Sequence, residues 1–89
     1  MEKNIFGQRL REIREQERMT QAKLAKALKV EQTHISRWER GERMPDTKTV
    51  VSIAVILRAS ADYLLGLTDK EYHFEYNHKD TKLIHREKK

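Results

Sequence analysis

The side chains best suited to specific chemistry lie between positions 32 and 37 and are Gln32, Thr33, His34 and Arg37. An arginine can donate two hydrogen bonds to O6 and N7 of guanine, and a glutamine can pair with both polar groups on the major-groove edge of adenine. Thr33 offers a hydroxyl or a methyl contact to thymine, and His34 could contact a base or a phosphate. These residue types therefore indicate a surface that could read base edges in DNA.

Helical spacing places these residues together on one side of a helix expected over residues 32–40. Ile35 and Trp38 are three residues apart and share the inward side, whereas positions 33, 34 and 37 point the other way and position 32 begins the helix. The same spacing predicts that Trp38 belongs to the core rather than to a base-stacking surface.

A preceding short helix must hold this helix in place. Thr20 is a suitable N-cap for a helix over residues 21–28, whose inward stripe is Leu24, Ala25 and Leu28. Gly41 can adopt the left-handed conformation that ends the helix over residues 32–40. Two short helices joined by a tight turn, with polar side chains exposed on the second, predict a helix-turn-helix.

Three further helices complete an expected all-α domain over residues 4–67. The first covers residues 4–18, with Asn4 as N-cap and Arg9 on the solvent side. The next runs from an N-cap at Asp46 or Thr47 to residue 58, and the last covers residues 61–65 between Ser60 and Gly66. The residues expected to be buried in these helices are Ile5, Phe6, Leu10, Ile13, Val50, Val51, Ile53, Ala54, Leu57, Tyr63, Leu64 and Leu65.

Residues 68–89 differ from the helical part because aromatic and polar residues alternate over Tyr72, Phe74 and Tyr76. This period of two predicts a strand, and residues 77–80 could turn the chain into a second strand at 81–84. An isolated hairpin is marginally stable in water. The tail could therefore form a strand that dimerises, pack on its own domain, or remain disordered.

Composition narrows the class of protein. The 89 residues suffice for one small domain, and only 3 Gly and 1 Pro favour helices. A net charge of +5 suits a polyanionic partner without requiring one. The absence of cysteine excludes disulfides and thiolate metal sites. No apolar run is long enough for a signal peptide or a membrane span, so no membrane association and a cytoplasmic location are expected.

Catalytic and metal-binding readings find no support in the residue pattern. No nucleophile has a plausible base, and no glycine-rich phosphate loop is present, so an enzyme is not expected and no cofactor is implied. His73, His78 and His85 are separated by five and seven residues, which matches no common metal-ligand spacing. Solvated histidine side chains are the expected interpretation.

Several features in order resemble the lambda-repressor-like family of phage repressor and Cro-type proteins, the XRE-like transcriptional regulators. The resemblance covers about residues 4–67 and rests on Thr20-Gln21, Leu24-Ala25, Leu28, Val30, Ile35-Ser36, Trp38-Glu39, Gly41, Pro45 and the segment Ala61-Asp62-Tyr63-Leu64-Leu65-Gly66. A set of spaced features is more specific than a single short motif.

The resemblance implies a role for individual residues. Residues 32–40 would be the recognition helix, and Arg14 and Glu39 would form a partly buried ion pair. Residues implied or available to contact DNA phosphates are Gln21, Lys29, Arg40, Arg43 and Lys48. Two residues depart from the family pattern: Lys29 stands where glycine is usual in the turn, and Glu31 stands where a short capping side chain is usual.

The expected function is sequence-specific regulation of transcription by binding double-stranded DNA, most simply as a repressor. A homodimer would bind a two-fold symmetric operator whose half-sites lie about 34 Å apart. Two alternatives remain open at this stage. One is an antitoxin of a toxin–antitoxin pair, in which residues 69–89 bind a protein partner, and the other is a protein-interaction module without a DNA role.

Overall fold

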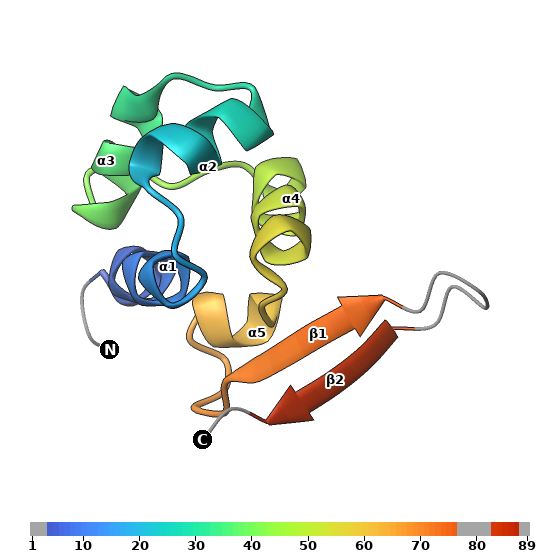
Figure 1. Ribbon diagram of the computed structural model, residues 1–89. Helices are drawn as coiled ribbons and strands as arrows, with labels where there is room; N and C mark the ends of the chain where they lie inside the picture. Colours follow the sequence, from blue (N-terminus) through green and yellow to red (C-terminus); the bar gives the residue numbers. More distant parts are fainter. Residues whose placement is uncertain (1–3, 77–82, 88–89) are drawn as a thin grey trace.

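Five helices and one two-stranded antiparallel sheet follow each other in the computed structural model, which describes residues 4–76 and 83–87 (Figure 1). The helices are α1 (Ile5–Gln16), α2 (Gln21–Leu28), α3 (Gln32–Glu39), α4 (Thr47–Leu57) and α5 (Ala61–Leu64), and the strands are β1 (Tyr72–Tyr76) and β2 (Leu83–Glu87). The predicted five-helix domain is therefore confirmed, with boundaries within about two residues of those expected.

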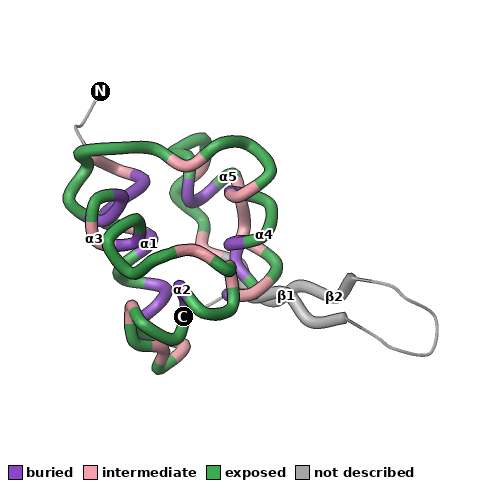
Figure 2. The backbone as a smooth tube through the Cα atoms, turned by 90° about the horizontal axis from the view of Figure 1, so that it is seen from above, coloured by how far each residue is buried: buried purple, intermediate pink, exposed green. Residues whose placement is uncertain are grey.

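The core lies where the five helices meet, because every helix contributes a fully buried side chain to it. These side chains are Leu10 of α1, Leu24 of α2, Ile35 of α3, Ile53 and Leu57 of α4, and Leu64 of α5. Figure 2 shows the buried segments facing inward between the helices. Each such leucine or isoleucine stabilises the fold by about 1.5–3 kcal/mol relative to exposure, so the small core fixes where α2 and α3 can lie.

Short polar side chains fix the beginnings of three helices. Thr20 Oγ1 accepts a hydrogen bond from the backbone N–H of Lys23 at 3.0 Å, which confirms the predicted N-cap of α2. Asp46 Oδ1 caps α4 at 2.8 Å and Ser60 Oγ caps α5 at 3.2 Å. Each cap satisfies a backbone N–H that the helix itself leaves unpaired and contributes about 1 kcal/mol.

The prediction that the Asn4 side chain caps α1 was wrong. Asn4 occupies the N-cap position with a left-handed backbone (φ 62°), but its Nδ2 donates to the carbonyl oxygen of Glu39 at 3.1 Å instead. Helix α1 packs so closely on the end of α3 that a Cβ atom on Gly7 would lie 2.7 Å from the Glu39 carbonyl oxygen. Glycine at position 7 permits this approach, which draws Asn4 across to α3.

Three expectations about burial were also wrong. Val51 is 56% exposed and Leu65 44% exposed, although both were expected in the core. Most residues of α4 are apolar, so hydrophobicity alone does not identify its inward side, and Leu65 lies just beyond the last residue of α5. Arg9, expected on the solvent side, lies 4.0 Å from the centre of the Tyr63 ring and donates to the carbonyl oxygens of Tyr63 and Thr68.

The strands form the hairpin that the alternating pattern suggested. They pair antiparallel in a register that runs from Tyr72 opposite Glu87 to Tyr76 opposite Leu83. The first strand has the predicted position, whereas the second extends to Glu87, and the turn expected at 77–80 lies outside the described residues. The extensive contacts of each strand are with the other strand, and the hairpin extends from the α5 side of the helical domain (Figure 1).

Within residues 4–76 and 83–87, no helix has both the length and the hydropathy needed to cross a bilayer.

Replacing Lys29 with glycine should stabilise the protein. Lys29 ends α2 with φ 60° and ψ 41°, a left-handed conformation that strains a residue with a Cβ atom by about 1–2 kcal/mol. After the larger entropy loss of glycine on folding, Lys29→Gly is expected to raise the free energy of unfolding in urea by about 0.5–1 kcal/mol.

Lys26→Gly is the matched control, because it makes the same substitution inside α2, where glycine costs about 1 kcal/mol. The two variants should therefore shift stability in opposite directions. A lower stability for both would show that the turn at Lys29 is unstrained.

Candidate nucleic-acid interface

The exposed side of α3 carries the four residues predicted to read bases. Gln32, Thr33, His34 and Arg37 are all exposed, whereas Ile35 is fully buried and Trp38 is only 6% exposed. The buried pair holds α3 against the core and thereby turns the other four side chains outward. The structure thus brings these four residues together on one surface of a short, rigid helix.

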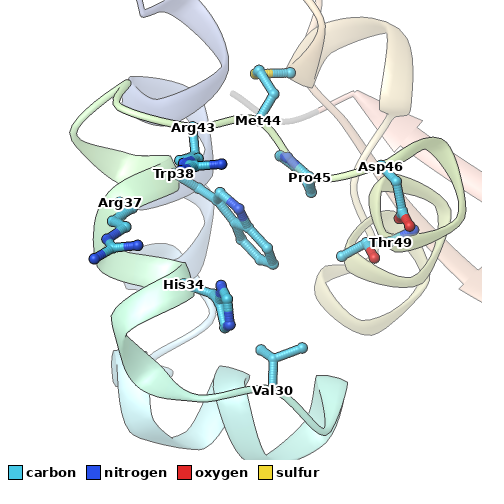
Figure 3. Close-up of a pocket in the computed structure, with 9 residues that line it drawn as sticks. All are labelled: Val30, His34, Arg37, Trp38, Arg43, Met44, Pro45, Asp46 and Thr49. Atoms are coloured by element: carbon cyan, nitrogen blue, oxygen red, sulfur yellow. The ribbon is translucent and has the colours of Figure 1, made fainter.

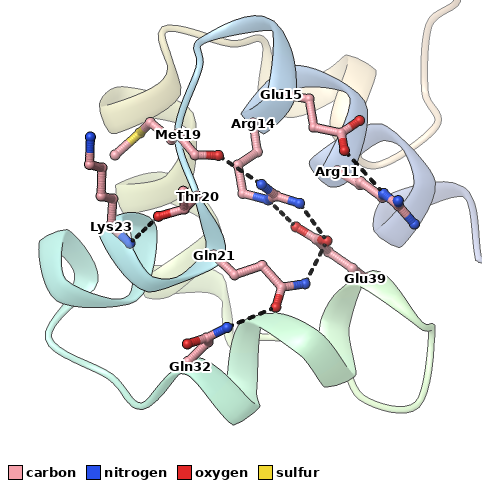
Figure 4. A network of polar contacts seen from close by, with 9 residues as sticks. All are labelled: Arg11, Arg14, Glu15, Met19, Thr20, Gln21, Lys23, Gln32 and Glu39. Carbon is pink, nitrogen blue, oxygen red and sulfur yellow. Dashed lines mark hydrogen bonds and ion pairs between the residues drawn. The ribbon is translucent and has the colours of Figure 1, made fainter.

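Gln32 is held at the beginning of α3 by a residue of the neighbouring helix. Its Nε2 donates to Gln21 Oε1 at 3.3 Å, and Gln21 Nε2 donates to Glu39 Oε1 at 3.0 Å (Figure 4). Because an ionised carboxylate can only accept, Glu39 requires Gln21 to present its amide nitrogen inward and its oxygen toward Gln32. Gln32 then keeps its own amide oxygen and one amide hydrogen for a contact outside the protein, the pair that adenine requires.

Arg14 and Glu39 form a buried, bidentate ion pair at the inner end of the hydrogen bonds that link Glu39, Gln21 and Gln32. Arg14 Nε donates to Glu39 Oε2 at 2.6 Å and Arg14 Nη2 donates to Glu39 Oε1 at 3.1 Å, with the side chains only 9% and 4% exposed. Arg14 also donates to the Met19 carbonyl oxygen at 2.7 Å. The hydrogen bond to Glu39 raises the pKa of Arg14 above its ordinary value, so this guanidinium stays charged. The pair expected from the family resemblance is therefore formed, and it ties α1 to α3.

A hollow of about 410 Å³ lies between α3 and the beginning of α4 (Figure 3). Its walls include the rings of His34 and Trp38, which lie 6.2 Å apart and tilted, together with Pro45. Arg37 and Arg43 line the same hollow and carry positive charge. The surface that could face DNA is therefore concave beside α3, with a cation on α3 and another in the connection to α4.

The residues predicted to contact phosphates are all at the surface except Gln21, which is half-buried. They differ in whether their side chains are already paired within the protein. Lys29, Arg43 and Lys48 are exposed. Arg40 instead donates from Nε and Nη2 to the two Glu42 oxygens at 2.7 and 3.1 Å, and also to Ser36 Oγ. This pairing raises the pKa of Arg40 and lowers that of Glu42, and it offsets the positive charge locally.

Sequence reasoning missed the acidic partner of Arg40 and the inward contact of Gln21. A separation of two residues, as between Arg40 and Glu42, is not a neighbour spacing on a helix, and this pair forms only because the chain leaves α3 at Arg40. The role of Gln21 depends on the tertiary position of Glu39. Glu31, which departs from the family pattern, stands at the N-cap of α3, and its side chain makes no capping hydrogen bond.

Metal ligands do not gather in the part of the chain whose side chains are described, residues 4–71, where no group of three His, Asp or Glu residues could hold an ion. The side chains of His73, His78 and His85 lie outside that part.

Comparison with known proteins identifies the arrangement. A family model described as Helix-turn-helix matches residues 10–64. Over 71 residues the chain is 38% identical to the HTH-type transcriptional regulator DicA of Escherichia coli (strain K12), a match that covers 78% of this chain and 53% of DicA. It is 34% identical over 77 residues to Repressor protein C2 of Salmonella phage P22, covering 82% of this chain and 36% of the repressor. The chain spans about half the length of the curated relatives it matches.

Two solved structures have the same helical arrangement. The P22 c2 repressor protein in complex with synthetic operator 9T superposes with a TM-score of 0.63 and 36% identity, over 66% of this chain and 89% of that one. The restriction-modification controller protein C.AhdI from Aeromonas hydrophila superposes with a TM-score of 0.63 and 30% identity, over 67% of this chain and 91% of that one.

Glu39→Gln should destabilise the protein far more than a matched change at the surface. It leaves the Arg14 guanidinium without a charged partner in a buried position, which is expected to lower the free energy of unfolding by about 3–5 kcal/mol. Glu15→Gln is the control, because its 3.4 Å pair with Arg11 is exposed and contributes less than about 1 kcal/mol.

Arg14→Met combined with Glu39→Leu should cost less than Glu39→Gln alone, since it leaves no unpaired buried charge. Equal losses for Glu39→Gln and Glu15→Gln in urea unfolding would show that the buried pair does not hold α1 to α3.

Proposed function

Given that this chain belongs to the helix-turn-helix family, we propose that it is a sequence-specific DNA-binding regulator of transcription, a repressor that occupies a two-fold symmetric operator as a homodimer. The observation that carries this proposal is the exposed row Gln32, Thr33, His34 and Arg37 on a helix anchored by the buried Arg14–Glu39 pair. A regulator of this kind acts where the chromosome is, which makes the cytoplasm its place of action.

Recognition of bases would use α3 in the major groove, which is wide enough to admit a helix. Arg37 would donate to a guanine, and Gln32, oriented by Gln21, would pair with an adenine. Thr33 and His34 lie between them in sequence and would contact a thymine methyl group or a phosphate. A bidentate contact of this kind contributes roughly 1–3 kcal/mol of discrimination against a wrong base.

Positioning on the duplex would use groups on both sides of α3. The beginning of α2 offers free backbone N–H groups, that of Gln21 among them, to the phosphates of one DNA strand. Beyond α3, the exposed Arg43 and Lys48 would contact the other strand, and Lys29 would add a contact near the turn. Arg40 would join them only by releasing Glu42 or sharing its guanidinium with a phosphate.

A homodimer is favoured by the chemistry of the hairpin. Among the residues that the structure describes, each strand of the two-stranded sheet has one edge without a strand partner, and such edges pair readily with another chain. Two copies joined through residues 68–89 would form a sheet of four strands, which is more stable than an isolated hairpin. Two α3 helices would then face two half-sites, which multiplies the few contacts that one domain can make.

Selection of bound fragments from random DNA tests this function. The enriched sequences are expected to contain two inverted half-sites about 34 Å apart, one helical turn of DNA. Arg37→Ala and Gln32→Ala should each change the preferred base at one position and weaken binding to the original site by about 1–3 kcal/mol. Lys48→Ala should weaken all sequences alike, because a phosphate contact carries no base preference.

No enriched sequence at low salt would refute DNA recognition. Unchanged preferences in both Arg37→Ala and Gln32→Ala would refute the base-reading residues alone, and a single unpaired half-site would refute the homodimer.

Glu42→Gln should strengthen binding to any duplex DNA. The change removes a negative charge beside α3 and frees the Arg40 guanidinium, so affinity should rise several-fold at low salt. The plot of log affinity against log salt concentration should become steeper by about one unit, as expected for one more phosphate contact. Asp62→Asn, which removes a negative charge from α5, is the control, and an equal effect of both changes would show that Arg40 lies away from the phosphates.

A further inference from the structure

An apolar hollow lies away from the exposed face of α3, and of the residues proposed to contact DNA only Lys29 lines it. It has a volume of about 380 Å³ and runs between the end of α2 and the exposed side of α4, two helices that contact each other. Its lining comprises Ala27, Leu28, Lys29, Val51, Ser52, Val55 and Ile56. We call this hollow the α2–α4 groove.

Apolar side chains in the walls of the α2–α4 groove are exposed to solvent. Val51 and Val55, four residues apart on α4, are 56% and 47% exposed, although the pattern of the helix suggested that Val51 belongs inside. Leu28 and Ile56 form the floor and pack against the core. A single exposed valine needs no explanation, but two valines that flank a hollow with an apolar floor form a contiguous surface of the kind that binds a partner.

The two helices that form the α2–α4 groove carry positive charge and no negative charge. Residues 21–29 and 47–58, which comprise both helices and their C-caps, contain no Asp or Glu. They contain five exposed cationic residues: Lys23, Lys26, Lys29, Lys48 and Arg58. Lys29 lines the groove, Lys48 lies one turn before Val51, and Arg58 ends α4. The nearest acidic residues in sequence, Glu31 and Asp46, stand at the N-cap positions of α3 and α4 and do not line the groove.

These features determine what can occupy the groove. A second copy placed face to face would bring Lys29, Lys48 and Arg58 against their own counterparts, and like charges opposed across an interface cost several kcal/mol. A membrane surface would need apolar side chains that protrude from a convex helix face, whereas here they line a concavity between two helices. A helix with an apolar stripe and acidic flanks matches both the concave shape and the charge.

We propose that the α2–α4 groove is a docking site for an acidic amphipathic helix of another protein. Helix α4 has 11 residues and is about 16 Å long, so it would contact about three turns of the bound helix. Apolar side chains at spacings of three and four residues would contact Val51, Val55 and Leu28, and flanking carboxylates would face Lys29, Lys48 and Arg58. The groove is separate from the exposed face of α3, so base reading by α3 and binding of such a helix would compete only for Lys29 and Lys48.

Two synthetic helical peptides test the proposal on the complete chain. Both have leucines at positions i, i+3, i+4 and i+7; one has glutamates at the flanking positions and the other has lysines. In amide NMR spectra the glutamate peptide should shift signals of residues 27–29 and 51–56 and should bind at least tenfold more tightly than the lysine peptide. Combined Val51→Ser and Val55→Ser should weaken that binding at least tenfold without changing affinity for the selected DNA.

Leu67→Ser is the matched control, because Leu67 is 75% exposed and lies outside the groove, and it should leave peptide binding unchanged. Lys29→Glu with Arg58→Glu keeps the apolar walls and should reverse the preference between the two peptides. Equal binding of both peptides, shifts on another face, or unchanged binding in the double serine variant would overturn the proposal. Loss of a dimer in the double serine variant, measured by sedimentation, would also overturn it, because the groove would then bind a second copy. The same NMR shifts with anionic vesicles, and none with the peptide, would assign the groove to a membrane surface instead.

Discussion

The position of α3 depends on one buried ion pair. Arg14 lies on α1 and Glu39 at the last turn of α3, and their hydrogen bonds join these two helices. The glutamate also accepts from Gln21 of α2, so a single carboxylate is shared by three helices. Removing two charges from water costs several kcal/mol. Hydrogen bonds offset this cost only when every oxygen and N–H of the pair has a partner, so such a site specifies one packing of the three helices rather than several.

The Glu39 carboxylate also fixes the orientation of two side-chain amides, those of Gln21 and Gln32, the second of which lies at the protein surface. An amide can be turned by half a rotation at little cost, and only a neighbour of fixed polarity decides which end points outward. Here the ionised Glu39 determines the orientation of Gln21, which determines that of Gln32. Preorganisation of this kind lowers the entropy lost when a base is bound, because the side chain is already in position.

Much of the fold could be predicted from local signals in the sequence. Thr20, Asp46 and Ser60 each cap a backbone N–H three residues further along the chain, so capping positions can be recognised without knowledge of the tertiary structure. The exposed face of α3 followed from the three-residue spacing of Ile35 and Trp38. By contrast, the exposure of Val51 and the Arg40–Glu42 pair depend on how neighbouring segments pack and leave their helices, and periodicity does not encode these features.

The contact of Arg9 with Tyr63 and Thr68 gives the hairpin a fixed attachment. Arg9 belongs to α1, and its guanidinium holds two carbonyl oxygens on either side of the last turn before the sheet. Helix α1 in turn holds α3 through Arg14. A twist applied to the hairpin would therefore reach α3 through α1. In the proposed dimer joined at the hairpins, the length of the connection between α5 and β1, residues 65–71, would set the position of one α3 helix relative to the other along the DNA.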